Sequence, residues 1–123
     1  MRVPFDSARG RLWLAVLSTV VVFAACSLPG DSLPDSILLS YDKLWHLGCF
    51  AVLAVLWQRA GWSALRTLLA GALFGLGIEV WQRVAPIGRF FDLKDLAADV
   101  AGVFLGLALV AIVRRWRQDR VAV

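Results

Sequence analysis

The stretch "SYDKLWHLGCF", Ser40 to Phe50, brings an aspartate, a lysine and a histidine into the start of a long apolar run. The run is long enough to predict a membrane-spanning helix over about 41–57. A hydrocarbon interior excludes ionisable side chains unless they have partners or a use. Asp42, Lys43 and His46 therefore indicate either polar packing between helices or a functional site.

The whole chain has the composition of a membrane protein. Of its 123 residues, 60% are hydrophobic, and the mean hydropathy is +0.74. Each crossing of the hydrocarbon takes about 20 helical residues, so the chain has room for about four spans and no additional soluble domain. The sequence predicts an all-α, polytopic membrane protein that forms a single domain over 1–123. The four predicted transmembrane helices cover about 12–28, 41–57, 65–82 and 95–113.

The basic residues predict the orientation of these spans. Most fall on the side of the two termini and of the second connection: Arg2, Arg9, Arg11, Arg59, Arg66, Arg114, Arg115, Arg117 and Arg120. The other side holds Lys43, Arg83, Arg89 and Lys94. This bias puts both termini in the cytoplasm. It also explains the net charge of +4 without nucleic-acid binding, which we do not expect.

The first apolar run has a second interpretation. "RGRLWLAVLSTVVVFAAC" has the basic start and apolar middle of a secretory signal, and its last letters resemble a lipoprotein cleavage site at Cys26. Phe23 fits such a site poorly, so we expect a retained span. Cys26 and Cys49 are then expected to be small packing residues rather than a redox pair or zinc ligands.

Three predicted spans carry polar residues in the same leaflet, near the outer face. Within each span, helical spacing puts the polar residues on one face together with small residues. These faces hold Asp42, His46 and Cys49; Gly75, Glu79 and Gln82; and Asp95, Asp99, Gly102 and Gly106. "GALFG" and "GVFLG" (71–75 and 102–106) let helix backbones approach closely. The polar faces are therefore predicted to turn toward one another.

Simpler interpretations exist for some of these residues. Asp42 and Asp92 could each cap a helix, and His46 alone could form a hydrogen bond between helices. Asp95 and Asp99 lie four residues apart and repel, so one of them binds a cation, pairs with arginine or stays protonated. One histidine excludes a multi-histidine zinc site, but carboxylates and His46 could hold a harder divalent ion. No cofactor other than this possible ion is expected.

Three motifs together resemble the VanZ-like family of small membrane proteins: "DKLWH" (42–46), "EVWQ" (79–82) and "RFFDLKDLAADVAG" (89–102). The resemblance covers about 42–106. It implies a protein of the bacterial inner membrane, and the namesake of the family is associated with resistance to the glycopeptide teicoplanin. Carried over by position, the characteristic polar residues are Asp42, Lys43, His46, Glu79, Gln82, Arg89, Asp92 and Asp95. The family commonly has asparagine where this chain has Asp99.

We expect these residues to form an outward-facing pocket that binds a lipid-linked, amphiphilic or glycopeptide-related ligand of the cell envelope. Lys43 and Arg89 would receive an anionic headgroup. Glu79, Asp95 and Asp99 would hold these cations in place, and His46 would adjust their protonation.

Two other classes of function are open. One is an intramembrane enzyme acting on a lipid phosphate, with His46, Glu79 and Asp95 as catalytic candidates and the carboxylates binding a metal. The other is a structural module that docks a partner protein. Membrane lipids are expected partners in every case, and the glycine faces could also support a homo-oligomer.

Overall fold

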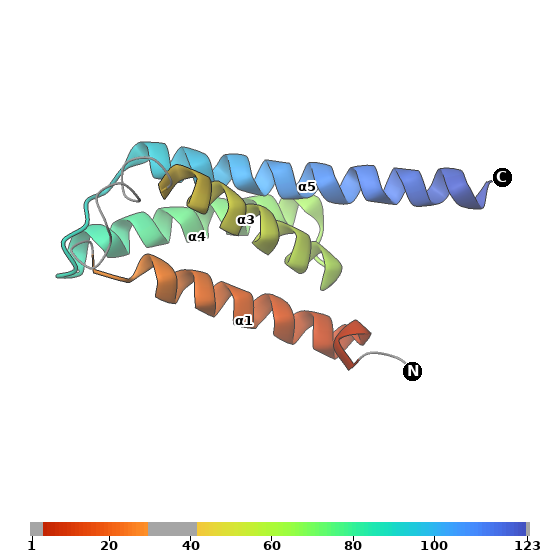
Figure 1. Ribbon diagram of the computed structural model, residues 1–123, viewed down its shortest axis with the longest axis horizontal. Helices are drawn as coiled ribbons and strands as arrows, with labels where there is room; N and C mark the ends of the chain where they lie inside the picture. The colour runs from red at the N-terminus through yellow and green to blue at the C-terminus, as the bar shows by residue number, and fades with distance from the viewer. Residues whose placement is uncertain (1–3, 30–41, 123) are drawn as a thin grey trace.

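The computed structural model describes residues 4–29 and 42–122, which form helices and no strands. The helices are η1 (Pro4–Asp6, a single 3-10 turn), α1 (Ala8–Cys26), α3 (Asp42–Arg59), α4 (Ala64–Val84) and α5 (Leu93–Val121). The four α-helices run in alternating directions, and the start of α1 and the end of α5 lie at the same end of the molecule (Figure 1). The all-α prediction is confirmed.

Three of the helices, α1, α4 and α5, are long and apolar enough to cross a membrane. The fourth, α3, is long enough at 18 residues but carries Asp42, Lys43 and Arg59, so it does not meet the same standard of composition. Its role as a span stays a prediction. Tyr41, the first residue predicted for it, lies outside the described residues.

Two helices end at residues other than the ends of the spans predicted within them, and the bounds of those spans stay predictions. Helix α1 ends at Cys26, two residues before the predicted end at Leu28, and its C-cap Ser27 bonds back to the last turn. Helix α5 continues to Val121 instead of ending near Val113. Hydropathy marks where an apolar run ends, whereas the arginine and glutamine residues that follow Val113 are good helix formers.

Local sequence explains where the other helices begin and end. Ser63 precedes α4 and accepts a hydrogen bond from the backbone N–H of Arg66, and Asp92 precedes α5 and accepts one from Lys94. The capping interpretation of Asp92 is therefore confirmed. Asp42 is the first residue of α3 itself. Gly61, between α3 and α4, and Gly88, between α4 and α5, adopt positive φ angles of 104° and 69°, at which glycine is the least strained residue.

Glycines let α5 lie directly against the other helices. A Cβ atom on Gly102 would collide with the backbone carbonyl of Leu47, and one on Gly106 would collide with that of Ala51. Gly71 of α4 instead faces the side chain of Val103. The prediction that the glycine motifs bring helix backbones together is confirmed for Gly102 and Gly106, whereas the glycines of 71–75 make room for side chains of α5.

The interior of the bundle is unusually polar. Its largest fully buried side chains include Phe50, Ile78 and Val103, but also His46, Glu79, Gln82 and Asp99. Large apolar side chains instead cover the outside, as with Leu73 and Val84, which are 69% and 70% exposed. An apolar exterior around a polar interior suits a bundle surrounded by lipid.

Candidate functional site

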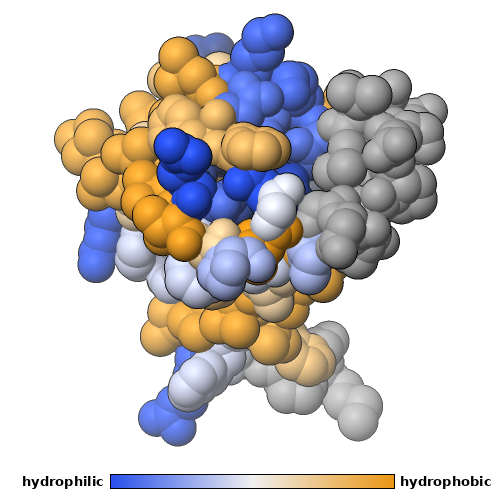
Figure 2. Space-filling model, turned by 90° about the vertical axis from the view of Figure 1, so that its left-hand side faces the viewer, coloured by the Kyte–Doolittle hydropathy of each residue, from blue (hydrophilic) through white to orange (hydrophobic). Residues whose placement is uncertain are grey.

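The polar residues predicted from the sequence meet at one end of the bundle, where α3 and α5 begin and α4 ends. We call Asp42, Lys43, His46, Glu79, Arg89, Asp92, Asp95 and Asp99 the polar cluster. Figure 2 looks onto this end, where hydrophilic side chains gather beside hydrophobic ones. His46, Glu79 and Asp99 are 1%, 0% and 0% exposed, so the deepest part of the cluster is closed to the surface.

His46 and Asp99 form the innermost pair of the cluster. Nδ1 of His46 lies 2.7 Å from Oδ1 of Asp99, which joins α3 to α5. With Asp99 ionised, its oxygen can only accept, so Nδ1 carries the proton and Nε2 of the neutral ring has a free lone pair. Nε2 lies 3.8 Å from Oδ1 of Asp42, one helical turn nearer the start of α3.

Three ion pairs lie nearer the starts of α3 and α5 than this pair does. Nζ of Lys43 is 3.1 Å from Oδ1 of Asp95 and 3.3 Å from Oδ2 of Asp92, and the Arg89 guanidinium is 3.3 Å from Oδ1 of Asp42. Asp95 thus pairs with a lysine, while Arg89 takes a different carboxylate. The repulsion expected between Asp95 and Asp99 is reduced because each has a partner on α3.

Glu79 connects α4 to the beginning of α5. Its Oε2 accepts a hydrogen bond of 2.9 Å from the backbone N–H of Asp92. The Asp92 carboxylate accepts the backbone N–H of Lys94 and the ammonium of Lys43, and these two donors hold the pKa of Asp92 below its usual value. Asp92 therefore caps the start of α5 and also pairs with Lys43.

Gln82 does not join the ionised residues. Its side-chain amide donates to the backbone carbonyl of Cys26, at 2.9 Å, where α1 ends and its last carbonyls have no helical partner. Trp81 makes a similar connection, because its indole N–H donates to Oγ of Ser27 at 2.9 Å. Sequence reasoning missed both contacts with α1. The feature that could have indicated them is the glutamine one turn after Glu79 on the same helix face.

Two overlapping groups in the cluster have the donor types of a metal site. One consists of Asp42, His46 and Asp95, and the other of His46, Glu79 and Asp99. In each group, one ligand atom per residue lies within 4.8 Å of the others. Imidazole and carboxylate are ordinary ligands of divalent metals, so these residues fit such an ion.

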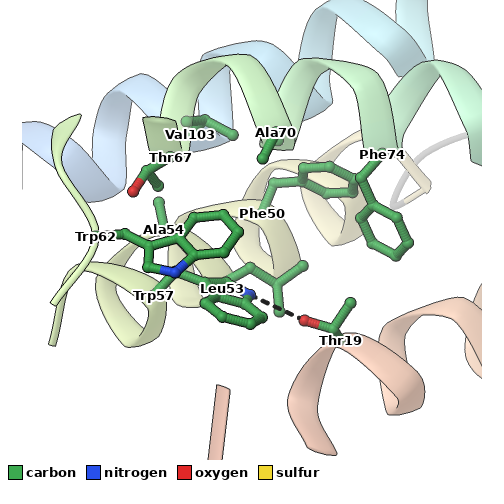
Figure 3. A pocket seen from close by; sticks show the side chains of 11 residues that line it. Thr19, Phe50, Leu53, Ala54, Trp57, Trp62, Thr67, Ala70, Phe74 and Val103 are labelled. Atoms are coloured by element: carbon green, nitrogen blue, oxygen red, sulfur yellow. Dashed lines mark hydrogen bonds between the residues drawn. The ribbon is translucent and has the colours of Figure 1, made fainter. Parts of the chain in front are cut away.

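An apolar cavity of about 150 Å³ lies between α1, α3 and α4, away from the polar cluster (Figure 3). The indole N–H of Trp57 donates to Oγ1 of Thr19 at its edge, at 3.0 Å. The residues that line it are Thr19, Phe50, Leu53, Ala54, Trp57, Trp62, Thr67, Ala70, Gly71, Phe74 and Val103. With almost no polar lining, this cavity offers packing space and no catalytic groups.

Comparison with known proteins agrees with the resemblance noted in the sequence motifs. The family model described as VanZ/LLP1 matches residues 3–114, which extends beyond 42–106 on both sides and includes the whole polar cluster. No curated protein and no solved structure matches the chain. Since the match covers nearly the entire chain, the protein belongs to the VanZ/LLP1 family.

Proposed function

We propose that the protein crosses the bacterial inner membrane four times, with both termini in the cytoplasm and the polar cluster near the periplasmic face. The alternating directions of the four helices support this topology, as does the shared end at which α1 begins and α5 finishes. In α3, Asp42 and Lys43 lie at one end and Arg59 at the other. Its length of about 27 Å is close to the thickness of a hydrocarbon core.

In this orientation the protein binds an amphiphilic ligand of the envelope, with an anionic headgroup at the polar cluster and its hydrocarbon chain along the outside of the bundle. The observation that carries this proposal is the position of Lys43. Its side chain is 44% exposed although it joins the buried Asp95. Beside it in the sequence, Leu44 and Trp45 are 62% and 55% exposed. One ligand with a charged end and an apolar end can satisfy both surfaces.

The ion pairs give each residue a distinct role in this binding. Asp92 is 41% exposed, so a phosphate can replace it at Lys43, while Asp95, 6% exposed, keeps the ammonium in position. Arg89 is 9% exposed and held by Asp42, which makes it a fixed second cation. Phosphate recognition by a lysine and an arginine follows from their charge and donor geometry.

The test is the thermal unfolding of the purified protein in detergent with a polyprenyl phosphate, compared with the uncharged polyprenol. The phosphate should raise the unfolding temperature and the alcohol should not. Lys43→Gln should remove the increase. Lys94→Gln is the matched control, because Lys94 is exposed and forms no salt bridge in the described part of the chain. Equal responses of the two variants would contradict the proposal.

The pair of His46 and Asp99 favours a second candidate function, an intramembrane enzyme that hydrolyses a lipid phosphate ester. A histidine whose Nδ1 is held by a carboxylate has Nε2 available for proton transfer. Release of phosphate from a polyprenyl monophosphate, abolished in His46→Gln, would establish it. A structural module would instead be indicated if His46→Gln no longer folds and the parent chain shows neither ligand binding nor turnover. Growth in teicoplanin with and without the chain tests the resistance associated with the family.

A further inference from the structure

We propose that His46, Glu79 and Asp99 bind one divalent transition-metal ion in the buried part of the polar cluster. The three residues come from α3, α4 and α5, and each offers one ligand atom within 4.8 Å of the other two. All three are at least 99% buried. This site does not depend on the lipid ligand proposed above.

Unpartnered atoms point to an ion at this position. In the described part of the chain, the buried side-chain atoms without a hydrogen-bond partner include Nε2 of His46, Oε1 of Glu79 and Oδ2 of Asp99. Arg11, far from the cluster, supplies the fourth such atom. Buried polar atoms are rarely left without partners, because their desolvation costs free energy. Oε1 of Glu79 and Oδ2 of Asp99 belong to one group of metal-ligand residues and indicate a missing common partner. The His46 nitrogen on the side of Asp99 is Nδ1, which binds the ion once its proton has moved to Nε2, the nitrogen that lies 3.8 Å from Asp42.

The charges separate this trio from the neighbouring group of Asp42, His46 and Asp95. Asp42 is already paired with Arg89, and Asp95 with Lys43. Neither Glu79 nor Asp99 has a lysine or arginine partner among the salt bridges of the described residues. Two carboxylates and a neutral imidazole carry a charge of −2, which one divalent cation neutralises.

The surroundings suit metal ligands. The backbone N–H of Asp92 holds Oε2 of Glu79, which leaves Oε1 to reach an ion. Asp99 lies against Gly75, where a Cβ atom would come within 2.8 Å of Oδ2, so glycine preserves the space that this oxygen occupies. A mixed imidazole and carboxylate set favours manganese, iron or zinc over calcium or magnesium, which prefer oxygen ligands alone.

Direct metal titration tests the proposal. Untagged protein in nanodiscs of zwitterionic lipid is stripped with chelator and titrated with Mn²⁺, while the electron paramagnetic resonance signal of free Mn²⁺ is followed. We expect one Mn²⁺ per chain, displaced by Zn²⁺. Glu79→Gln, Asp99→Asn and His46→Gln should each weaken binding at least tenfold. Asp6→Asn, at the opposite end of the bundle, should bind within about twofold of the parent chain.

Pulsed resonance of the bound ion provides a measurement that does not depend on variants. His46 is the only histidine of the sequence, so coupling of Mn²⁺ to an imidazole nitrogen identifies it as a ligand. Absence of saturable binding, or bound Mn²⁺ without this coupling, would overturn the proposal. So would a folded Glu79→Gln protein that binds like the parent chain, or a loss of binding confined to Asp95→Asn.

Discussion

The backbone N–H of Asp92 and the Oε2 atom of Glu79 are 2.9 Å apart, which ties the residue that caps α5 to a carboxylate buried in α4. Asp92 also contacts Lys43 at the start of α3. Three helix ends that are distant in the sequence are thus joined around one residue pair. The ends of the helices, rather than their middles, hold the polar cluster together.

Removing the acceptor should therefore loosen this end of the bundle. Glu79→Ala is expected to lower the free energy of unfolding by about 1–3 kcal/mol, because the partly buried N–H of Asp92 loses its partner. Glu79→Gln keeps a carbonyl oxygen at that place and should lose less. Unfolding in mixed micelles of increasing SDS content measures both. Equal losses would mean that the hydrogen bond does not stabilise the fold.

The glycine contacts of α5 predict a strong dependence on side-chain size. Gly102→Ala places a Cβ atom against the Leu47 carbonyl, so α3 and α5 must separate, at a cost of about 1–3 kcal/mol. Gly77→Ala is the control, since no atom lies within 4 Å of its Cβ position. That variant should be neutral or slightly stabilising, because alanine is the better helix former. The same micelle titration distinguishes them.

The two acidic partners of Lys43 should contribute unequally. Asp95→Asn should destabilise the protein by about 1–3 kcal/mol, because its side chain is only 6% exposed and the bond is charge-assisted. Asp92→Asn, at an exposed pair, should cost less than about 1 kcal/mol, since asparagine also caps helices and solvent weakens the ion pair. A larger loss for Asp92→Asn than for Asp95→Asn, measured by thermal unfolding, would contradict this order.

At the apolar cavity, one hydroxyl connects α1 to α3. Oγ1 of Thr19 donates to the carbonyl of Ala15 and accepts the indole N–H of Trp57. Thr19→Val preserves the shape but leaves this N–H without a partner, so we expect a loss of about 1 kcal/mol. Thr19→Ser retains the hydroxyl and should preserve most of the stability. If both variants unfold at the same temperature, the hydrogen bond contributes nothing.

The sequence predicted which residues share a helix face and which end of the bundle they occupy. Those predictions depend on the helical period and on the alternating direction of successive helices. Both can be inferred from the sequence, because the first is a local property and the second follows from the order of the spans. The meeting of His46, Glu79 and Asp99 at one end of the bundle follows from them. The motifs also indicated the family that the whole-chain match establishes.

The individual partners were beyond reach of the sequence. Arg89 lies outside the helices, so no period indicates that it contacts Asp42 rather than Asp95 or Asp99. Gln82 had the same spacing as a cluster residue, yet it bonds to Cys26 because the end of α1 leaves carbonyls without helical partners. The relative rotation of neighbouring helices decides such choices, and it depends on the packing of the whole bundle.

The glycine contacts between α3 and α5 have a mechanical consequence. Where the backbone of one helix occupies the place of the other's side chains, neither helix can slide or rotate without a collision. Helices α3 and α5 therefore form a rigid pair. Helix α1 makes contacts of another kind, because Thr19, Cys26 and Ser27 connect it to the other helices through separate hydrogen bonds. Such bonds can be exchanged one at a time, so α1 can change its position more easily than α3 or α5 can.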